Sequence, residues 1–137
     1  MDGEGNQTSR GNYKGHAVQK IKTPIRVPFN KNRQYVLFHV ADDSAKFKRR
    51  NECYAYYIEA DVRHLRRGLF GHIHLSELNR SPLAHELVAH EIEHLVFDWV
   101  LSHKGMTFNR RNEERISDMV GEIHRRFWRK YERLAGR

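Results

Sequence analysis

The sequence predicts an α+β fold in which a small sheet of three to four strands is followed by two long helices. In the first half of the chain, apolar and polar residues alternate with the period of a half-buried strand. In the second half, apolar residues recur at spacings of three and four, which is the period of an amphipathic helix. Strands that precede helices, instead of alternating with them, favour this fold class. The length of 137 residues suits a single domain.

The first 22 residues differ in composition from the rest of the chain. They hold four of the nine glycines, several basic and amide side chains, and few apolar residues. A segment of this kind cannot bury enough surface to offset its ordering entropy. We therefore expect residues 1–22 to form a mobile, basic and glycine-rich arm, and residues 23–137 to form the folded domain.

Three segments in the first half are predicted as strands. Residues 34–41 alternate between two faces, residues 53–61 are rich in tyrosine and isoleucine, and residues 69–75 form a short apolar run. Gly71, inside the third segment, indicates a bulge or a close approach of another part of the chain. Residues 42–51 carry a basic run and are predicted as a polar connector.

Two long helices are predicted in the second half, over residues 82–101 and from a cap at Asn109 or Asn112 to residue 134. Ser81, directly before a proline, is typical of a helix start. The apolar stripes that we expect to face the core are Val88, Ile92, Leu95, Val96, Trp99 and Val100 on the first helix, and Ile116, Val120, Ile123, Phe127, Tyr131 and Leu134 on the second.

The chain is basic, with 25 Lys and Arg against 17 Asp and Glu and a formal net charge of +8. This balance indicates either a well-solvated surface or attraction to nucleic acid through the basic patches at residues 46–50, 63–67 and on the last helix. One cysteine cannot form an internal disulfide, and no apolar run is long enough to span a bilayer. The N-terminus lacks the pattern of a secretory signal. We therefore expect a cytoplasmic protein without a membrane partner.

Residues 90–94 match the His-Glu-x-x-His pattern, inside the first long helix. His90 and His94 are four residues apart, so both imidazoles project from one helical face and can bind one metal ion. Glu91 lies roughly 100° around the helix from His90, where its carboxylate can contact a water on the metal without being a ligand. The pattern predicts a zinc site with a general base.

A hydrolytic zinc site takes three protein ligands and leaves one position open for water. Glu114 and Asp118 are four residues apart at the start of the last helix and share one face. Glu114 is our predicted third ligand, and Asp118 is predicted to accept the second ring N–H of a ligand histidine. His103 is the competing third ligand. It can coordinate only if the first helix ends near residue 101, because in an unbroken helix it points away from His94.

The two motifs together resemble those of the gluzincin metallopeptidases, in which a His-Glu-x-x-His helix is followed by a second helix bearing Glu-x-x-x-Asp. The likeness spans residues 69–121 at most, and it departs from the family pattern at Glu113, which is an additional acid, and at Arg115, where a small residue is usual. The resemblance implies a minimal zincin-like core and a zinc-dependent peptidase that acts on peptide or protein substrates. It also implies that residues 69–75 form a sheet edge on which an extended peptide can pair.

The resemblance further implies roles for individual residues. Zinc is held by His90, His94 and Glu114. Glu91 is the general base that takes a proton from the attacking water, and Asp118 is the hydrogen-bond partner of the zinc ligand His90. The donor that stabilises the oxyanion stays open among His72, His74, His103, His124 and Tyr131.

A basic nucleic-acid-associated protein, in which zinc is structural or absent, is the alternative from another functional class. A third hypothesis combines the two as a protease of DNA-bound proteins, with a zinc site completed by His103. The order of His94, His103, Gly105 and Phe108 resembles the three-histidine pattern of Spartan-type DNA–protein crosslink proteases.

The other histidines carry less information. His85 is predicted to lie at the edge of the core. His72 and His74 share one strand face and either line the cleft or meet solvent, while His39 and His64 belong to no motif.

Overall fold

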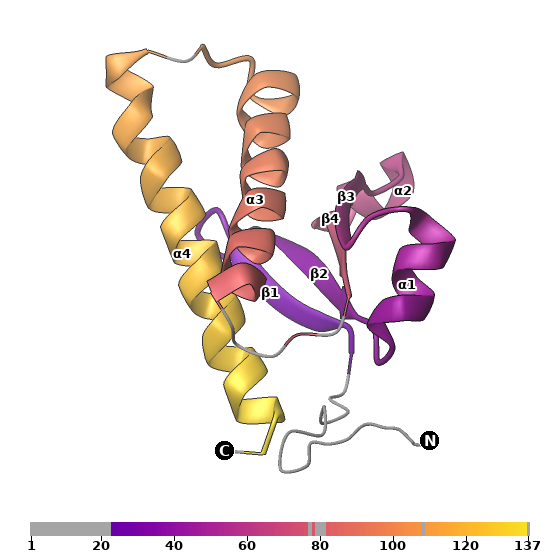
Figure 1. The fold of residues 1–137 in the computed structure, drawn as a ribbon. Coiled ribbons are helices and arrows are strands. Elements are labelled where there is room, and N and C mark those ends of the chain that lie inside the picture. Colours follow the sequence, from indigo (N-terminus) through magenta and orange to yellow (C-terminus); the bar gives the residue numbers. More distant parts are fainter. Residues whose placement is uncertain (1–22, 77, 79–81, 108, 137) are drawn as a thin grey trace, which may run out of the picture.

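The computed structural model describes residues 23–76, 78, 82–107 and 109–136. Over these residues the chain forms a mixed α/β fold, a four-stranded sheet accompanied by helices (Figure 1). The arm predicted for residues 1–22 lies outside the described residues. In chain order the elements are β1 (Ile25–Phe29), β2 (Gln34–Val40), α1 (Ser44–Asn51), β3 (Ala55–Glu59), α2 (Val62–Arg66), β4 (Leu69–Leu75), α3 (Pro82–Asp98), the π-helical turn η2 (Trp99–His103) and α4 (Arg110–Leu134).

The sheet has the strand order β1-β2-β4-β3. β1 pairs with β2, and β3 with β4, in antiparallel fashion, whereas β2 and β4 run parallel. The parallel pair is joined by a crossover that contains α1, β3 and α2. The expectation that residues 69–75 form a sheet edge is therefore wrong. The crossover places β3 on the outer side of β4, so β4 is an internal strand, and the two edges of the described sheet are β3 and β1.

The three predicted strands are confirmed as β2, β3 and β4, each within a few residues of its expected bounds. β1 supplies the fourth strand. Its Ile25, Val27 and Phe29 are buried and alternate with more exposed neighbours, which is the pattern of a strand with one face on the core.

Both predicted long helices are confirmed, and they lie side by side on one face of the sheet (Figure 1). Asn109 caps α4, because its side chain accepts a hydrogen bond from the backbone N–H of Asn112 at 3.0 Å. The predicted apolar stripe of α3 and η2 is fully buried, and in α4 only Val120 and Leu134 of the predicted stripe are partly or largely exposed. Among the described residues, no helix combines the length and the apolar character that a membrane crossing requires.

Residues 42–51, predicted as a polar connector, instead contain the helix α1. Asp43 caps this helix by accepting a hydrogen bond from the backbone N–H of Lys46 at 3.0 Å. Glu52 ends it in the left-handed conformation, with φ of 60°. None of its side chains is buried. The apolar periodicity on which the prediction relied therefore could not reveal the helix, and only the cap marks it.

The close approach predicted at Gly71 is confirmed. A Cβ atom at this position would lie 2.7 Å from Cε1 of Tyr57 and 2.9 Å from the carbonyl oxygen of Ile58.

We expect Gly71→Ala to lower the free energy of unfolding by about 1–3 kcal/mol. The added methyl group would be too close to the backbone of Ile58, which cannot move aside as easily as a side chain. Urea unfolding measures this effect. Gly121→Ala is the matched control: no atom lies within 4 Å of its added Cβ, and alanine stabilises an exposed helical position. Equal stability changes in the two variants would contradict the packing argument.

Candidate metal centre

His90 and His94 form a close pair on the exposed side of α3. Their Nε2 atoms lie 3.1 Å apart, and the two rings are nearly perpendicular at 87°. A zinc ion held tetrahedrally at about 2.0–2.1 Å from two ring nitrogens needs those nitrogens roughly 3.3 Å apart. The observed separation therefore fits two ligands that point at one ion, as the four-residue spacing predicts.

Glu91 is the buried member of this site. Its exposed fraction is 6 %, whereas the two histidines are exposed. A carboxylate oxygen of Glu91 and one nitrogen of each ring all lie within 4.8 Å of one another. Burial raises the pKa of Glu91 above its ordinary value, and the neighbouring His94 and His90 oppose that rise. A carboxylate with a raised pKa is a better proton acceptor near neutral pH than one in water.

A pocket of about 460 Å³ lies beside this site, between α3 and the edge strand β3. Its lining residues are Ala55, Tyr56 and Tyr57 from β3, and Glu91, His94 and Asp98 from α3. The buried carboxylate and one of the paired imidazoles thus share a pocket with β3, one of the two edge strands of the sheet.

The structure does not bring Glu114 or Asp118 to the histidine pair. Both are exposed on α4. Neither belongs to any group of described His, Asp and Glu side chains whose ligand atoms lie within 4.8 Å of one another. Within the described part of the chain, Glu91 is the one further side chain that joins His90 and His94 in such a group.

The packing of α4 against α3 explains this placement. The rings of His85 and Trp128 stack with their centroids 4.0 Å apart, and the Arg115 guanidinium lies 5.5 Å from the Trp99 ring. The first contact shows which side of α3 faces α4 and confirms that His85 lies at the edge of the core, and the second shows that η2 continues the same packing. His90 follows His85 by five residues, which places it roughly 140° around the helix. The histidine pair therefore faces away from the helix that carries the predicted third ligand.

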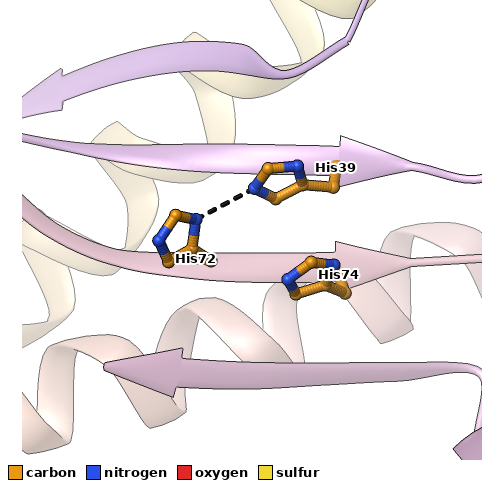
Figure 2. A group of neighbouring side chains, drawn as sticks. All are labelled: His39, His72 and His74. Atoms are coloured by element: carbon orange, nitrogen blue, oxygen red, sulfur yellow. Dashed lines mark hydrogen bonds between the residues drawn. The ribbon is translucent and has the colours of Figure 1, made fainter. Parts of the chain in front are cut away.

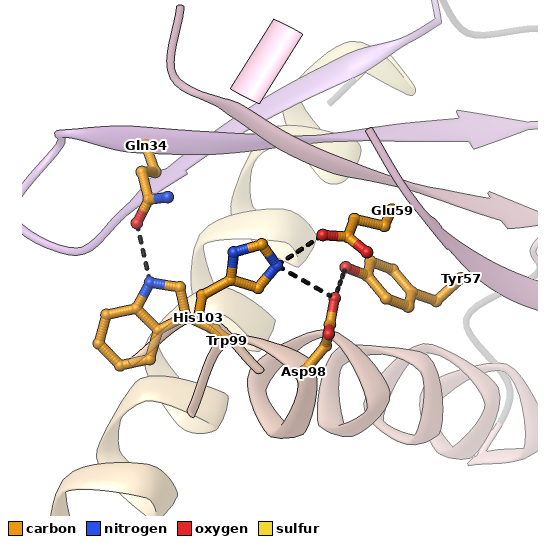
Figure 3. Close-up of polar contacts among 6 residues, drawn as sticks. All are labelled: Gln34, Tyr57, Glu59, Asp98, Trp99 and His103. Carbon is orange, nitrogen blue, oxygen red and sulfur yellow. Dashed lines mark hydrogen bonds and ion pairs between the residues drawn. The ribbon is translucent and has the colours of Figure 1, made fainter. Parts of the chain in front are cut away.

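His103, the competing third ligand, belongs to a different group, with Glu59 and Asp98 (Figure 3). Its Nε2 atom lies 2.5 Å from Oε2 of Glu59 and 3.9 Å from Oδ2 of Asp98. In an α-helix, His103 would lie roughly 140° around the axis from Asp98. The wider turn of η2, with its i to i+5 period, brings the two side chains to the same side. The structure therefore directs His103 toward the end of β3 and away from the histidine pair.

Two hydrogen bonds fasten this end of α3 to the sheet (Figure 3). The hydroxyl of Tyr57 donates to Oδ2 of Asp98 at 2.7 Å, and Nε1 of Trp99 donates to Oε1 of Gln34 at 2.8 Å. Burial and the hydrogen bond to Asp98 raise the pKa of Tyr57 well above its ordinary value. The helix that carries the histidine pair is thus held in place against β2 and β3.

A third group of ligand atoms consists of His39, His72 and His74, on β2 and β4. The sequence places His72 and His74 on one strand face, but it gives His39 no partner. Only the parallel pairing of two strands that are distant in sequence brings His39 beside the other two. The sequence shows only that His39 lies on the more polar face of an alternating strand. It does not show which strand lies beside that face.

Part of the basic surface on α4 has structural partners. Nη1 of Arg126 donates to the carbonyl oxygen of Pro28 at 2.9 Å, and the same guanidinium pairs with Glu122. Nζ of Lys130 donates to the carbonyl oxygen of Arg26. These two cations fasten α4 to β1, so their presence needs no nucleic acid to explain it.

Comparisons with protein-family models, with curated proteins and with solved structures give no match for this chain. The resemblance to gluzincins thus rests on two short motifs of the sequence. Of these, the side chains of the His-Glu-x-x-His motif lie together in the structure, and the Glu-x-x-x-Asp motif lies apart from them.

Proposed function

We propose that this protein is a zinc-dependent peptidase that holds its metal ion through His90 and His94 and uses Glu91 as its general base. The observation that carries the proposal is the geometry of these three side chains, two ring nitrogens 3.1 Å apart with a buried carboxylate within 4.8 Å. Imidazole nitrogens are ligands that zinc prefers, and two of them leave coordination positions open for water and substrate.

The chemistry follows from the placement of Glu91. A zinc ion at such a site supplies Lewis acidity, which lowers the pKa of water and polarises a substrate carbonyl. Glu91 takes a proton from the attacking water and delivers it to the leaving amine. Its burial supports this role, because a carboxylate with a raised pKa holds the proton long enough to pass it on.

The edge strand β3 supports a peptide as the substrate. Within the described sheet, β3 pairs on one side only, with β4. An extended peptide can add to such an open edge through main-chain hydrogen bonds. Because β3 lines the same cavity as Glu91 and His94, a peptide bound along this edge would pass beside the general base.

Metal content tests the ligand assignment. We expect His94→Ala to lower the zinc affinity of this site by at least about tenfold, because one of two protein ligands is lost. Glu114→Gln is expected to leave the affinity within about twofold of wild type, since Glu114 lies exposed on α4. Zinc titration of metal-free protein, with bound metal measured by mass spectrometry, distinguishes the two variants.

Each variant has an outcome that overturns part of the proposal. If His94→Ala binds as much zinc as wild type with the same affinity, the pair is not a metal site. If Glu114→Gln loses zinc as His94→Ala does, then Glu114 is the third ligand that the gluzincin resemblance implies, and α4 moves when metal binds.

A further inference from the structure

We propose that His39, His72 and His74 form a second and independent site for a zinc-class transition-metal ion, on the face of the sheet opposite to α3. The inference goes beyond the proposed peptidase site, with which it shares no residue.

The sheet itself brings the three side chains together. His72 and His74 are two residues apart on β4, so their side chains project from the same face. β2 runs parallel to β4 with His39 directly opposite His74. Phe38, the neighbour of His39, contacts Phe127 of α4 at 4.3 Å between ring centroids. Successive strand residues point to opposite faces, so the three histidines project away from the long helices (Figure 2).

The nitrogen atoms lie at distances suited to one ion. Nε2 of His39 is 2.9 Å from Nδ1 of His72, and a ligand atom of His74 lies within 4.8 Å of both (Figure 2). Tetrahedral zinc needs ligand nitrogens roughly 3.3 Å apart. The parallel pairing of β2 with β4 holds the backbones of His39 and His74 directly opposite each other, so rotation of the side chains is the change needed to direct the three rings at one ion.

Burial favours the neutral form of all three rings, and the neutral form is the one that binds a metal ion. Burial and the mutual proximity of the rings lower the pKa of His39 to about 4. Burial also lowers the pKa values of His72 and His74. In the described part of the chain, no carboxylate forms a hydrogen bond or ion pair with any of these rings. The rings of His39 and His72 share one hydrogen bond, which coordination of both nitrogens to a metal ion would replace.

The surroundings leave the site open on one side. The ring of Tyr56 stacks on that of His74 at 4.7 Å between centroids. His39 and His74 line a pocket of about 420 Å³, which also includes Lys46 of α1. Three protein ligands with one open direction are typical of a zinc site that exchanges a ligand, whereas a purely structural site is closed by four.

The experiment titrates Co²⁺ alone into the full chain carrying His94→Ala, so that the peptidase site is disabled. We expect one Co²⁺ to bind with the visible absorption of a site of low coordination number. Adding His72→Gln should weaken this binding by at least about tenfold. The matched control is His64→Gln, whose ring is exposed on α2 and bonds to Asp61, and it should leave the binding unchanged.

A second readout covers the case in which His72→Gln does not fold. In the unsubstituted chain, Zn²⁺ alone should shift the imidazole NMR signals of His39, His72 and His74 but leave that of His64 unmoved. Co²⁺ binding that is equally strong with His72→Gln, or three ring signals that excess Zn²⁺ does not shift, would overturn the proposal. Either result concerns this face of the sheet only, so it leaves the peptidase proposal standing.

Discussion

Glu91→Gln is expected to reduce peptide hydrolysis by about 10²–10⁴-fold while the protein keeps its zinc. The substitution preserves the size of the side chain but removes the proton acceptor. In the proposed site Glu91 is not a ligand, so we expect His90 and His94 to hold the ion in the variant as well. The measurement is the rate of cleavage of a fluorescently quenched, unfolded protein substrate by the zinc-loaded enzyme, compared with the zinc content of the same sample.

Glu93→Gln provides the matched control for this prediction. Glu93 lies in the same helix, two residues from Glu91, but it is exposed and outside the lining of the cavity. The control variant should therefore hydrolyse the substrate at nearly the wild-type rate. If both variants retain full activity, Glu91 is not the general base. If the wild-type protein with zinc cleaves none of a broad set of unfolded substrates, the peptidase proposal itself fails.

The largest loss of stability is expected for Phe127→Ala, which should lower the free energy of unfolding by about 3–5 kcal/mol. The Phe127 side chain is fully buried, and its ring packs on Phe38 of β2. Its removal leaves a cavity at the contact between α4 and the sheet, where the surrounding backbone is too constrained to collapse. Urea unfolding of the variant and of wild type measures the difference.

Leu134→Ala is the control on the same helix. Leu134 is 43 % exposed, in the last turn of α4. We expect its truncation to cost less than about 1 kcal/mol, because little apolar surface is buried there. A loss for Phe127→Ala no greater than that for Leu134→Ala would mean that α4 does not pack on the sheet as described.

The sequence predicts most of the fold because local signals define most of its elements. The stripes of α3 and α4 recur at helical spacing over several turns, and Asn109 provides the cap of α4. The order of the strands in the sheet cannot be predicted in this way, because it depends on pairing between segments that are distant in the sequence. Nothing local in residues 55–59 or 69–75 indicates which of the two strands lies outside the other.

The candidate site is predictable only where its residues share one helix. The spacing of His90 and His94 fixes their geometry, but a third ligand depends on the crossing of two helices, which no spacing specifies. His103 illustrates a second limit. Its direction follows from the π-helical turn η2, which the α-helical period of the sequence does not indicate.

The parallel pairing of β2 with β4 requires a long segment of chain to close into a loop during folding. β1 joins β2 through a tight turn, and α3 lies next to α4 along the chain, so both of these contacts form between near neighbours. β2 cannot meet β4 until the crossover between Val40 and Leu69 has closed, and that closure costs entropy before any strand pairing offsets it. We expect this closure to be the slow step of folding. Destabilising substitutions along the β2–β4 pairing should then slow folding, whereas those in the β1–β2 turn should mainly speed unfolding.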